Sequence, residues 1–168
     1  MRNKDYTYIT IAELIANQNS TCCKRKVGAI LVKEGHGVST GFNGSVSGAE
    51  HCEDHFFNLY LKEGPSIPFK DWLKSDRIRK LHKIFQYKYE PHAEINAINF
   101  AAKMGISTEG TELYVSSSPC FNCAKTIIQS GIKSVYFSKV YESERGAIDY
   151  LRENNIFVKQ VGKWSLSI

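Results

Sequence analysis

Two short stretches of the chain combine residue types that bind metal ions. They are Pro91-His92-Ala93-Glu94 and Pro119-Cys120-Phe121-Asn122-Cys123, and each opens a run with helical periodicity. Cys120 and Cys123 are three residues apart, so both sulfurs project from one face of an opening turn, where the positive helix end favours the metal-binding thiolate. With His92 as third ligand, the fourth position of a zinc ion stays open for water, which is typical of a catalytic site.

Glu94 lies two residues after His92 and is not needed as a ligand. Zinc lowers the pKa of a bound water from ~15.7 toward roughly 7, and a neighbouring carboxylate can take up the released proton. Cys-x-x-Cys alone also occurs in structural zinc sites and redox sites, but His-x-Glu followed by Pro-Cys-x-x-Cys is typical of zinc-dependent nucleobase deaminases. The sequence therefore predicts attack of water on C4 of cytosine, with Glu94 carrying protons to ring N3 and to the departing ammonia.

The composition is that of a single globular domain. The 168 residues are 42% hydrophobic, and no run of eighteen apolar residues or N-terminal secretory pattern occurs, so we expect a soluble, cytoplasmic protein without a membrane partner. Five cysteines in such a chain favour metal binding over disulfides. The net charge of +5 favours anionic ligands, although the basic residues are scattered.

Helical and strand patterns alternate along the chain. We expect helices at about 9–19, 93–104, 120–130 and 146–154, and strands at about 27–32, 38–42, 112–116, 135–140 and 156–161. This order predicts the α/β class, with a three-layer α-β-α sandwich around a central mixed five-stranded sheet in one domain spanning 1–168. Residues 46–90 are polar and irregular, with one short helix expected near 78–85, and are interpreted as an insertion too short and too polar for its own core.

Beyond the metal motifs, the chain resembles the deoxycytidylate (dCMP) deaminase family, especially its phage-type members. The resemblance covers residues 9–161 and rests on Cys22-Cys23, Lys26-Val27-Gly28-Ala29, Ser39-Thr40-Gly41-Phe42-Asn43-Gly44-Ser45, His51-Cys52, His92-Ala93-Glu94-Ile95-Asn96-Ala97-Ile98, Ser118-Pro119-Cys120-Phe121-Asn122-Cys123-Ala124-Lys125 and Gln129-Ser130-Gly131-Ile132-Lys133. It implies the cytidine deaminase fold and zinc-dependent hydrolysis of dCMP to dUMP and ammonia, which supplies dUMP for thymidylate synthesis.

The resemblance also implies which residues bind the substrate. Asn43 would hydrogen-bond the sugar, and Tyr141 would stack on the cytosine, an interaction worth about 1–3 kcal/mol per base. Lys103 could face a phosphate, although an exposed lysine is usually just solvated. The implied substrate-binding set is Asn43, Ala93, Ser118, Tyr141, Phe100 and Lys103.

Regulation and assembly come from the same resemblance. Family members are commonly activated by dCTP with Mg²⁺ and inhibited by dTTP, bound to a homohexamer near a loop that corresponds here to Gly41, Phe42, Asn43, Gly44 and Ser45. Backbone amides in this loop could bind a triphosphate. From the residues alone, an ordinary glycine-rich turn is the simpler interpretation.

A second, structural zinc is implied at Cys22, Cys52, His82 and Glu90. Four protein ligands would close such a site and pin the insertion to the first helix. Alternatively, His82 is a core histidine and Glu90 a surface charge. Cys23 is left over and is expected to be a buried free thiol.

Three other functions remain open. The first is a bifunctional dCMP/dCTP deaminase, since the same catalytic groups would serve both nucleotides. The second is a deaminase that edits tRNA or single-stranded DNA, for which Arg77, Arg79, Lys80, Lys83, Tyr87 and Tyr89 could form a small basic and aromatic patch; no nucleic-acid partner is expected. The third is a zinc-stabilised interaction module without activity.

Overall fold

A mixed five-stranded sheet forms the centre of the computed structural model, which describes residues 4–162. Strand β1 (Gly28–Lys33) pairs antiparallel with β2 (His36–Phe42) and with β3 (Glu112–Ser117), whereas β4 (Ser134–Lys139) and β5 (Phe157–Gln160) continue in parallel from β3. The strand order is β2-β1-β3-β4-β5. The predicted sheet is confirmed.

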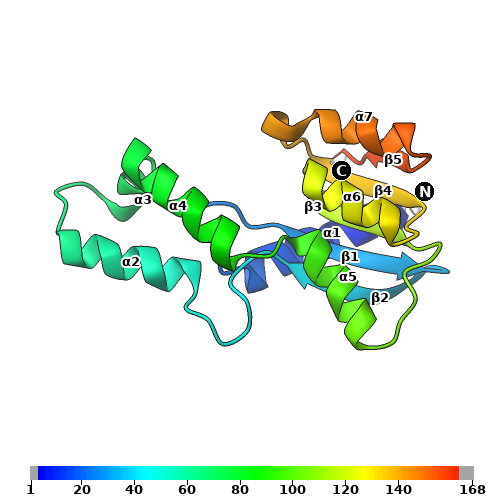
Figure 1. Ribbon diagram of the computed structural model, residues 1–168, viewed down its shortest axis with the longest axis horizontal. Coiled ribbons are helices and arrows are strands. Elements are labelled where there is room, and N and C mark those ends of the chain that lie inside the picture. Colours follow the sequence, from blue (N-terminus) through cyan, green and yellow to red (C-terminus); the bar gives the residue numbers. More distant parts are fainter. Residues whose placement is uncertain (1–3, 163–168) are drawn as a thin grey trace, which may run out of the picture.

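Helices cover both faces of this sheet (Figure 1). Helix α1 (Lys4–Asn19) lies on one face, and α5 (Ala93–Lys103), α6 (Phe121–Gln129) and α7 (Gly146–Glu153) lie on the other, with the short 3-10 helix η1 (Glu142–Glu144) before α7. This arrangement confirms the predicted three-layer sandwich. Within residues 4–162, no helix combines the length and hydrophobicity needed to cross a membrane.

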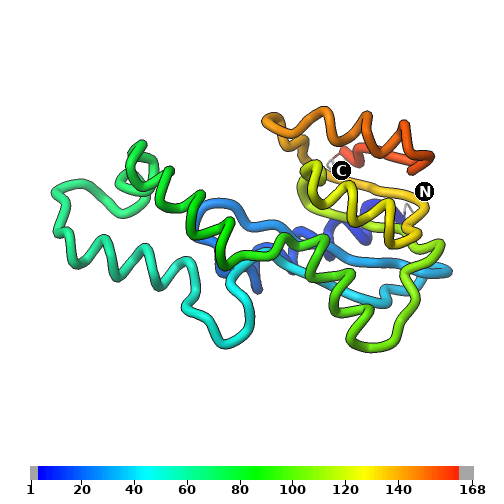
Figure 2. The backbone as a smooth tube through the Cα atoms, in the orientation of Figure 1, coloured from blue at the N-terminus to red at the C-terminus, as the bar shows by residue number. Residues whose placement is uncertain are grey.

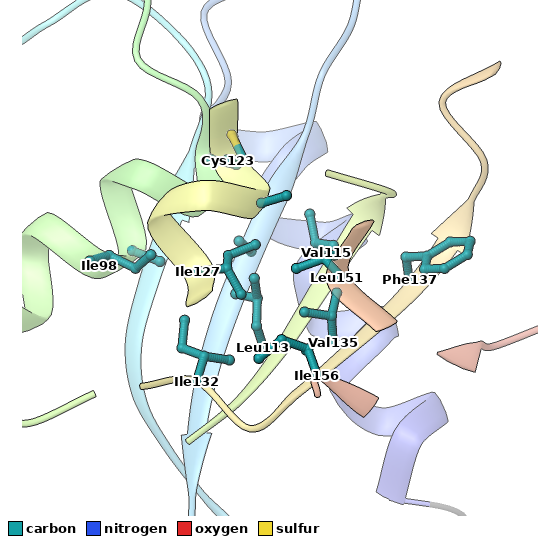
Figure 3. Packing of buried hydrophobic residues seen from close by; sticks show 14 of the residues in the cluster. Ile98, Leu113, Val115, Cys123, Ile127, Ile132, Val135, Phe137, Leu151 and Ile156 are labelled. Carbon is teal, nitrogen blue, oxygen red and sulfur yellow. The ribbon is translucent and has the colours of Figure 1, made fainter. Parts of the chain in front are cut away.

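Alternating side chains on the strands separate the core into two layers. Leu113, Val115 and Val135 point toward α6 and α7 in the larger cluster, part of which is seen in Figure 3. Ile30 and Tyr114 belong to a second cluster beneath α1. The sheet is therefore buried on both sides, which holds the strand ends that carry the site in fixed positions.

The insertion contains three helices and extends away from the layered body (Figures 1 and 2). They are α2 (Cys52–Glu63), α3 (Phe69–Trp72) and α4 (Asp76–Tyr89). Phe56, Trp72, Ile78 and Phe85 form a separate buried cluster there. The expectation of one short helix without a core was therefore wrong, because a few aromatic side chains bury enough area to hold three short helices together.

A close approach of β2 to α5 depends on Gly41. A Cβ atom at this position would lie 2.2 Å from the carbonyl oxygen of Ala93 and 2.4 Å from the amide nitrogen of Ala97. Ser39, two residues earlier on the same strand, donates a hydrogen bond of 2.6 Å to the carbonyl of Ala97. Because α5 begins beside His92, these contacts fix where the candidate site begins.

Candidate catalytic metal site

Two helix N-termini bring the three predicted metal ligands together. His92 is the N-cap residue of α5, Cys120 is the N-cap residue of α6, and Cys123 lies in the first turn of α6. His92 Nδ1 is 3.4 Å from Cys120 Sγ and 3.3 Å from Cys123 Sγ. Tetrahedral zinc with Zn–S of about 2.3 Å and Zn–N of about 2.0–2.1 Å separates such atoms by roughly 3.5 Å. The donor set therefore fits zinc.

Hydrogen bonds within this triad already favour one thiolate. The Cys123 thiol donates to Cys120, which with His92 lowers the pKa of Cys120 to about 3 despite its burial. The same bond and burial raise the pKa of Cys123. The hydrogen bond to Cys120 raises the pKa of His92 to about 8. Two sulfurs and one imidazole nitrogen are donor types that zinc prefers, and binding of the metal displaces the protons that these groups share.

Glu94 lies beside this triad and is only 4% exposed. Burial is the main cause that raises the pKa of its carboxyl group, since the charged form loses water. Its position in the first turn of α5 directs it toward Cys123 rather than toward solvent. A carboxyl group with this environment is suited to take up and release a proton at a reacting molecule.

A cavity of about 730 Å³ opens at His92, Cys120 and Glu94. Four of the residues implied to bind the substrate line it: Asn43, Ala93, Ser118 and Tyr141. Phe100 and Lys103 do not line it, and both are exposed on α5. The structure thus brings together only part of the expected substrate set.

Asn43 and Ser118 hold the backbone around the cavity. Asn43 is buried; its Oδ1 accepts hydrogen bonds from Ser20 Oγ and the Val27 amide, both at 2.7 Å, and its Nδ2 donates to the carbonyl of Arg25 at 2.8 Å. Ser118 Oγ accepts a 2.7 Å bond from the Tyr141 amide. Most of the hydrogen-bonding capacity of Asn43 is therefore used within the protein, which leaves one N–H of its amide for a ligand.

The loop expected to bind a regulatory nucleotide is also engaged internally. The Asn43 amide donates to the Val27 carbonyl at 3.0 Å, and the Ser45 amide donates to Thr21 Oγ1 at 3.2 Å. Gly41 packs against α5, as described above. The Ser45 hydroxyl is buried and has no hydrogen-bond partner within residues 4–162. Two backbone amides of this loop therefore already donate hydrogen bonds within the protein. Its glycines allow close packing of the backbone as well as the turn of the chain.

A second cluster of metal-binding side chains connects the insertion to the body. Cys22, Cys52, His82 and Glu90 are all buried, and one donor atom of each lies within 4.8 Å of the others. Cys22 Sγ is 3.5 Å from His82 Nε2, again the spacing that zinc imposes. Both carboxylate oxygens of Glu90 are buried without a hydrogen-bond partner within residues 4–162. An unpaired buried carboxylate is costly, so the cluster fits a cation.

Cys23 is a free cysteine at the edge of this cluster. It is partly buried rather than fully buried, and its Sγ lies 3.5 Å from Cys52 Sγ.

Glu90 is the C-cap residue of α4 and His92 is the N-cap residue of α5, so the single residue Pro91 separates the two candidate metal clusters. The segment 90–92 therefore carries one ligand of each.

Cationic side chains also line the cavity, and three of them belong to the patch that the sequence suggested only for a nucleic-acid partner. Lys24 and Arg25 line it, and so do Arg79, Lys80 and Lys83 from α4. The Arg25 guanidinium lies 4.1 Å above the ring of Tyr141. The sequence offered only a short basic block at 24–26 and scattered cations near 77–83, without a pattern that joins the two.

Comparison with known proteins gives consistent matches along most of the chain. The family described as "Cytidine and deoxycytidylate deaminase zinc-binding region" matches residues 2–139. The deoxycytidylate deaminase of Enterobacteria phage T2 is 39% identical over 95% of this chain and 93% of its own length, and that of Enterobacteria phage T4 is 38% identical over 98% and 93%. The crystal structure of dCMP deaminase from the cyanophage S-TIM5 in complex with dCMP and dUMP aligns with a TM-score of 0.70 and 32% identity, covering 96% of this chain and 99% of that one.

Proposed function

Because the chain belongs to the cytidine and deoxycytidylate deaminase family, we propose that it hydrolyses dCMP to dUMP and ammonia. The observation that carries the proposal is the triad of His92, Cys120 and Cys123 with buried Glu94 beside it at the base of a cavity. The names of the phage relatives, and the dCMP and dUMP in the S-TIM5 complex, support this nucleotide as the substrate.

The reaction exchanges the amino group on C4 of cytosine for the oxygen of water. His92, Cys120 and Cys123 would hold a zinc ion, which supplies acidity to a bound water and so makes it nucleophilic near neutral pH. Glu94 accepts a proton from the attacking water and gives it to ring N3. It then carries the second water proton to the amino group, which leaves as ammonia while C4 becomes a carbonyl carbon.

The walls of the cavity orient the base for this attack. Tyr141 lines the cavity, and the hydrogen bond from its amide to Ser118 fixes the position of its backbone. We assign stacking on the pyrimidine to Tyr141. Asn43 contributes its one unused N–H to the sugar, and its other hydrogen bonds hold the segment 25–27 at the cavity edge.

We also propose a structural zinc at Cys22, Cys52, His82 and Glu90. The unpaired carboxylate of Glu90 and the 3.5 Å contact between Cys22 and His82 support it. The site would join segment 22–23, α2 and α4 around a small aromatic cluster. Removal of this ion would then loosen the insertion first.

Regulation by dCTP with Mg²⁺ and by dTTP, in a homohexamer, is proposed on the family resemblance. Since the amides of Asn43 and Ser45 are already bonded, an effector at loop 41–45 would depend on other groups of the loop. Activity against dCMP with and without each nucleotide, together with the molecular mass in solution, tests both statements. An unchanged rate or a monomer would contradict them.

A substrate panel tests the proposed function. Zinc-loaded protein is given dCMP, dCTP, deoxycytidine and a single-stranded oligonucleotide containing one cytosine, and ammonia release is measured. We expect dCMP to be deaminated with the highest kcat/KM. Faster deamination of dCTP would favour the triphosphate as substrate, and faster deamination of the oligonucleotide, or none of any compound, would refute the proposal.

A further inference from the structure

The cavity is lined by five cationic side chains that come from two separate segments. We propose that Arg25 on one side, and Arg79 with Lys83 on helix α4 on the other, bind the 5′-phosphate of the nucleotide, so that the insertion selects nucleotides over nucleosides. This inference rests on the proposed function, whose chemistry at the base requires no phosphate. It assigns to α4 a role in substrate recognition in addition to the metal ligand His82.

One face of α4 is directed toward the cavity. The lining residues of this helix are Asp76, Arg79, Lys80, His82, Lys83 and Gln86. Positions 76, 79, 80 and 83 follow the i, i+3, i+4, i+7 spacing of a single helical face. Three of these four positions are cationic, so the wall that α4 presents to the cavity is positively charged.

These cations lack the carboxylate partners that similar side chains have elsewhere. Arg77, on the same helix but outside the cavity, donates to Glu63 at 2.6 Å, and Lys26 pairs with Glu53 at 2.9 Å. Within residues 4–162, Arg25, Arg79 and Lys83 form no ion pair with a carboxylate. Like charges gathered in one cleft repel each other and focus a positive potential, which a doubly charged phosphate relieves.

The position of Arg25 connects this charge to the catalytic end of the cavity. Its guanidinium lies 4.1 Å above the Tyr141 ring, the residue assigned to the pyrimidine. A phosphate one sugar away from a base at Tyr141 is therefore within reach of the guanidinium. Arginine is suited to this role because its planar fork donates two parallel hydrogen bonds to phosphate oxygens.

Direct contacts set the spacing between the two cationic walls. Cys22, three residues before Arg25, lies 3.5 Å from His82 and accepts a 3.6 Å hydrogen bond from Gln86 Nε2. His82 stands between Arg79 and Lys83 on α4. On the other segment, the hydrogen bond from Asn43 to the carbonyl of Arg25 fixes the backbone. The phosphate-binding groups are thus preorganised by buried contacts behind them.

The product dUMP and deoxyuridine, which lacks the phosphate, are not deaminated. Measuring how tightly each binds therefore distinguishes phosphate recognition from catalysis. Isothermal titration calorimetry with dUMP and with deoxyuridine is carried out on zinc-loaded parent, R25Q, R79Q and K83Q. The matched control is K88Q, on the same helix but outside the cavity. Each cavity substitution should weaken dUMP binding by about tenfold or more, because each removes a charged hydrogen bond. Deoxyuridine affinity should stay at the parent value in R79Q and K83Q, and K88Q should bind both compounds as the parent does.

Kinetics with dCMP provide a second measurement. Loss of phosphate binding shared by substrate and transition state should raise KM for dCMP more than it lowers kcat. Parent-like binding of dUMP by R79Q and K83Q would overturn the inference while leaving dCMP deamination intact. Tighter, steeply salt-dependent binding of a single-stranded oligonucleotide than of dUMP would also overturn it and assign the charge to nucleic acid. Failure of the parent to deaminate dCMP would instead refute the proposed function.

Discussion

Replacement of Gly41 by alanine tests how strictly β2 positions the catalytic helix. The added Cβ would lie 2.2 Å from the Ala93 carbonyl oxygen and 2.4 Å from the Ala97 amide nitrogen, both backbone atoms of α5. These distances are at least about 1 Å shorter than van der Waals contact. Since neither atom belongs to a flexible side chain, α5 must move as a unit, together with Glu94 in its first turn.

The cost of this movement follows from known magnitudes. Overpacking of a close backbone contact costs about 1–3 kcal/mol, which for a chain of this size lowers the melting temperature by roughly 3–10 °C. A displacement of about 1 Å at a reacting group costs on the order of a hundredfold in rate. We therefore expect G41A to be less stable and to deaminate dCMP about a hundredfold more slowly than the parent.

Gly37, on the same strand, supplies the matched control. A Cβ there would meet only the side chain of Ile30, with its flexible end, Cδ1, at 2.9 Å and Cγ1 at 3.7 Å, and neither glycine has a positive φ. G37A should therefore stay within about 0.5 kcal/mol of the parent and keep its activity. Thermal melts and dCMP kinetics of both variants measure the difference. If G41A matches G37A in both, the close approach of β2 does not position the site.

Three further predictions address the ligands and the core. E94Q should keep its catalytic zinc by elemental analysis yet lose about 10²–10⁴-fold in kcat; a parent-like rate would exclude Glu94 as the proton carrier. E90A should bind one zinc fewer per chain and melt at a lower temperature, whereas an unchanged zinc content would remove the structural site. Burial raises the pKa of Tyr114 above its ordinary value near 10, so the neutral phenol stabilises the fold below pH ~10 and this stability falls at higher pH. Y114F should therefore resist alkaline unfolding better than the parent, and an identical alkaline melting profile would contradict the assignment.

The candidate metal ligands and Glu94 could be predicted from the sequence because the two members of each pair lie close together in the chain. Cys120 and Cys123 lie within one helical turn, and Glu94 follows His92 at the start of another, so helix geometry nearly determines each half. Only the contact between the two helix N-termini depends on the fold. The order of helical and strand patterns along the chain was sufficient to predict that fold.

The sequence determines some features around the cavity more directly than others. Phe100 and Lys103 are six and nine residues beyond Glu94, and at 3.6 residues per turn both positions lie well around the helix from it. Their exposure could therefore have been foreseen. In contrast, Arg25 and Arg79 share a cavity only through the packing of the insertion, which rests on aromatic contacts between irregularly spaced residues. Packing between irregularly spaced residues leaves no periodic pattern in the sequence from which it could be predicted.

The segment Glu90–His92 has a consequence for how such chains can diverge. Its two ends serve different clusters across a single proline, whose ring restricts the backbone. Lengthening or shortening the mostly exposed loop 64–67 between α2 and α3 leaves this spacing untouched, so that loop is free to vary in length. One residue added inside the segment would rotate a ligand out of reach, and selection should therefore tolerate length changes on one side of α4 and none on the other.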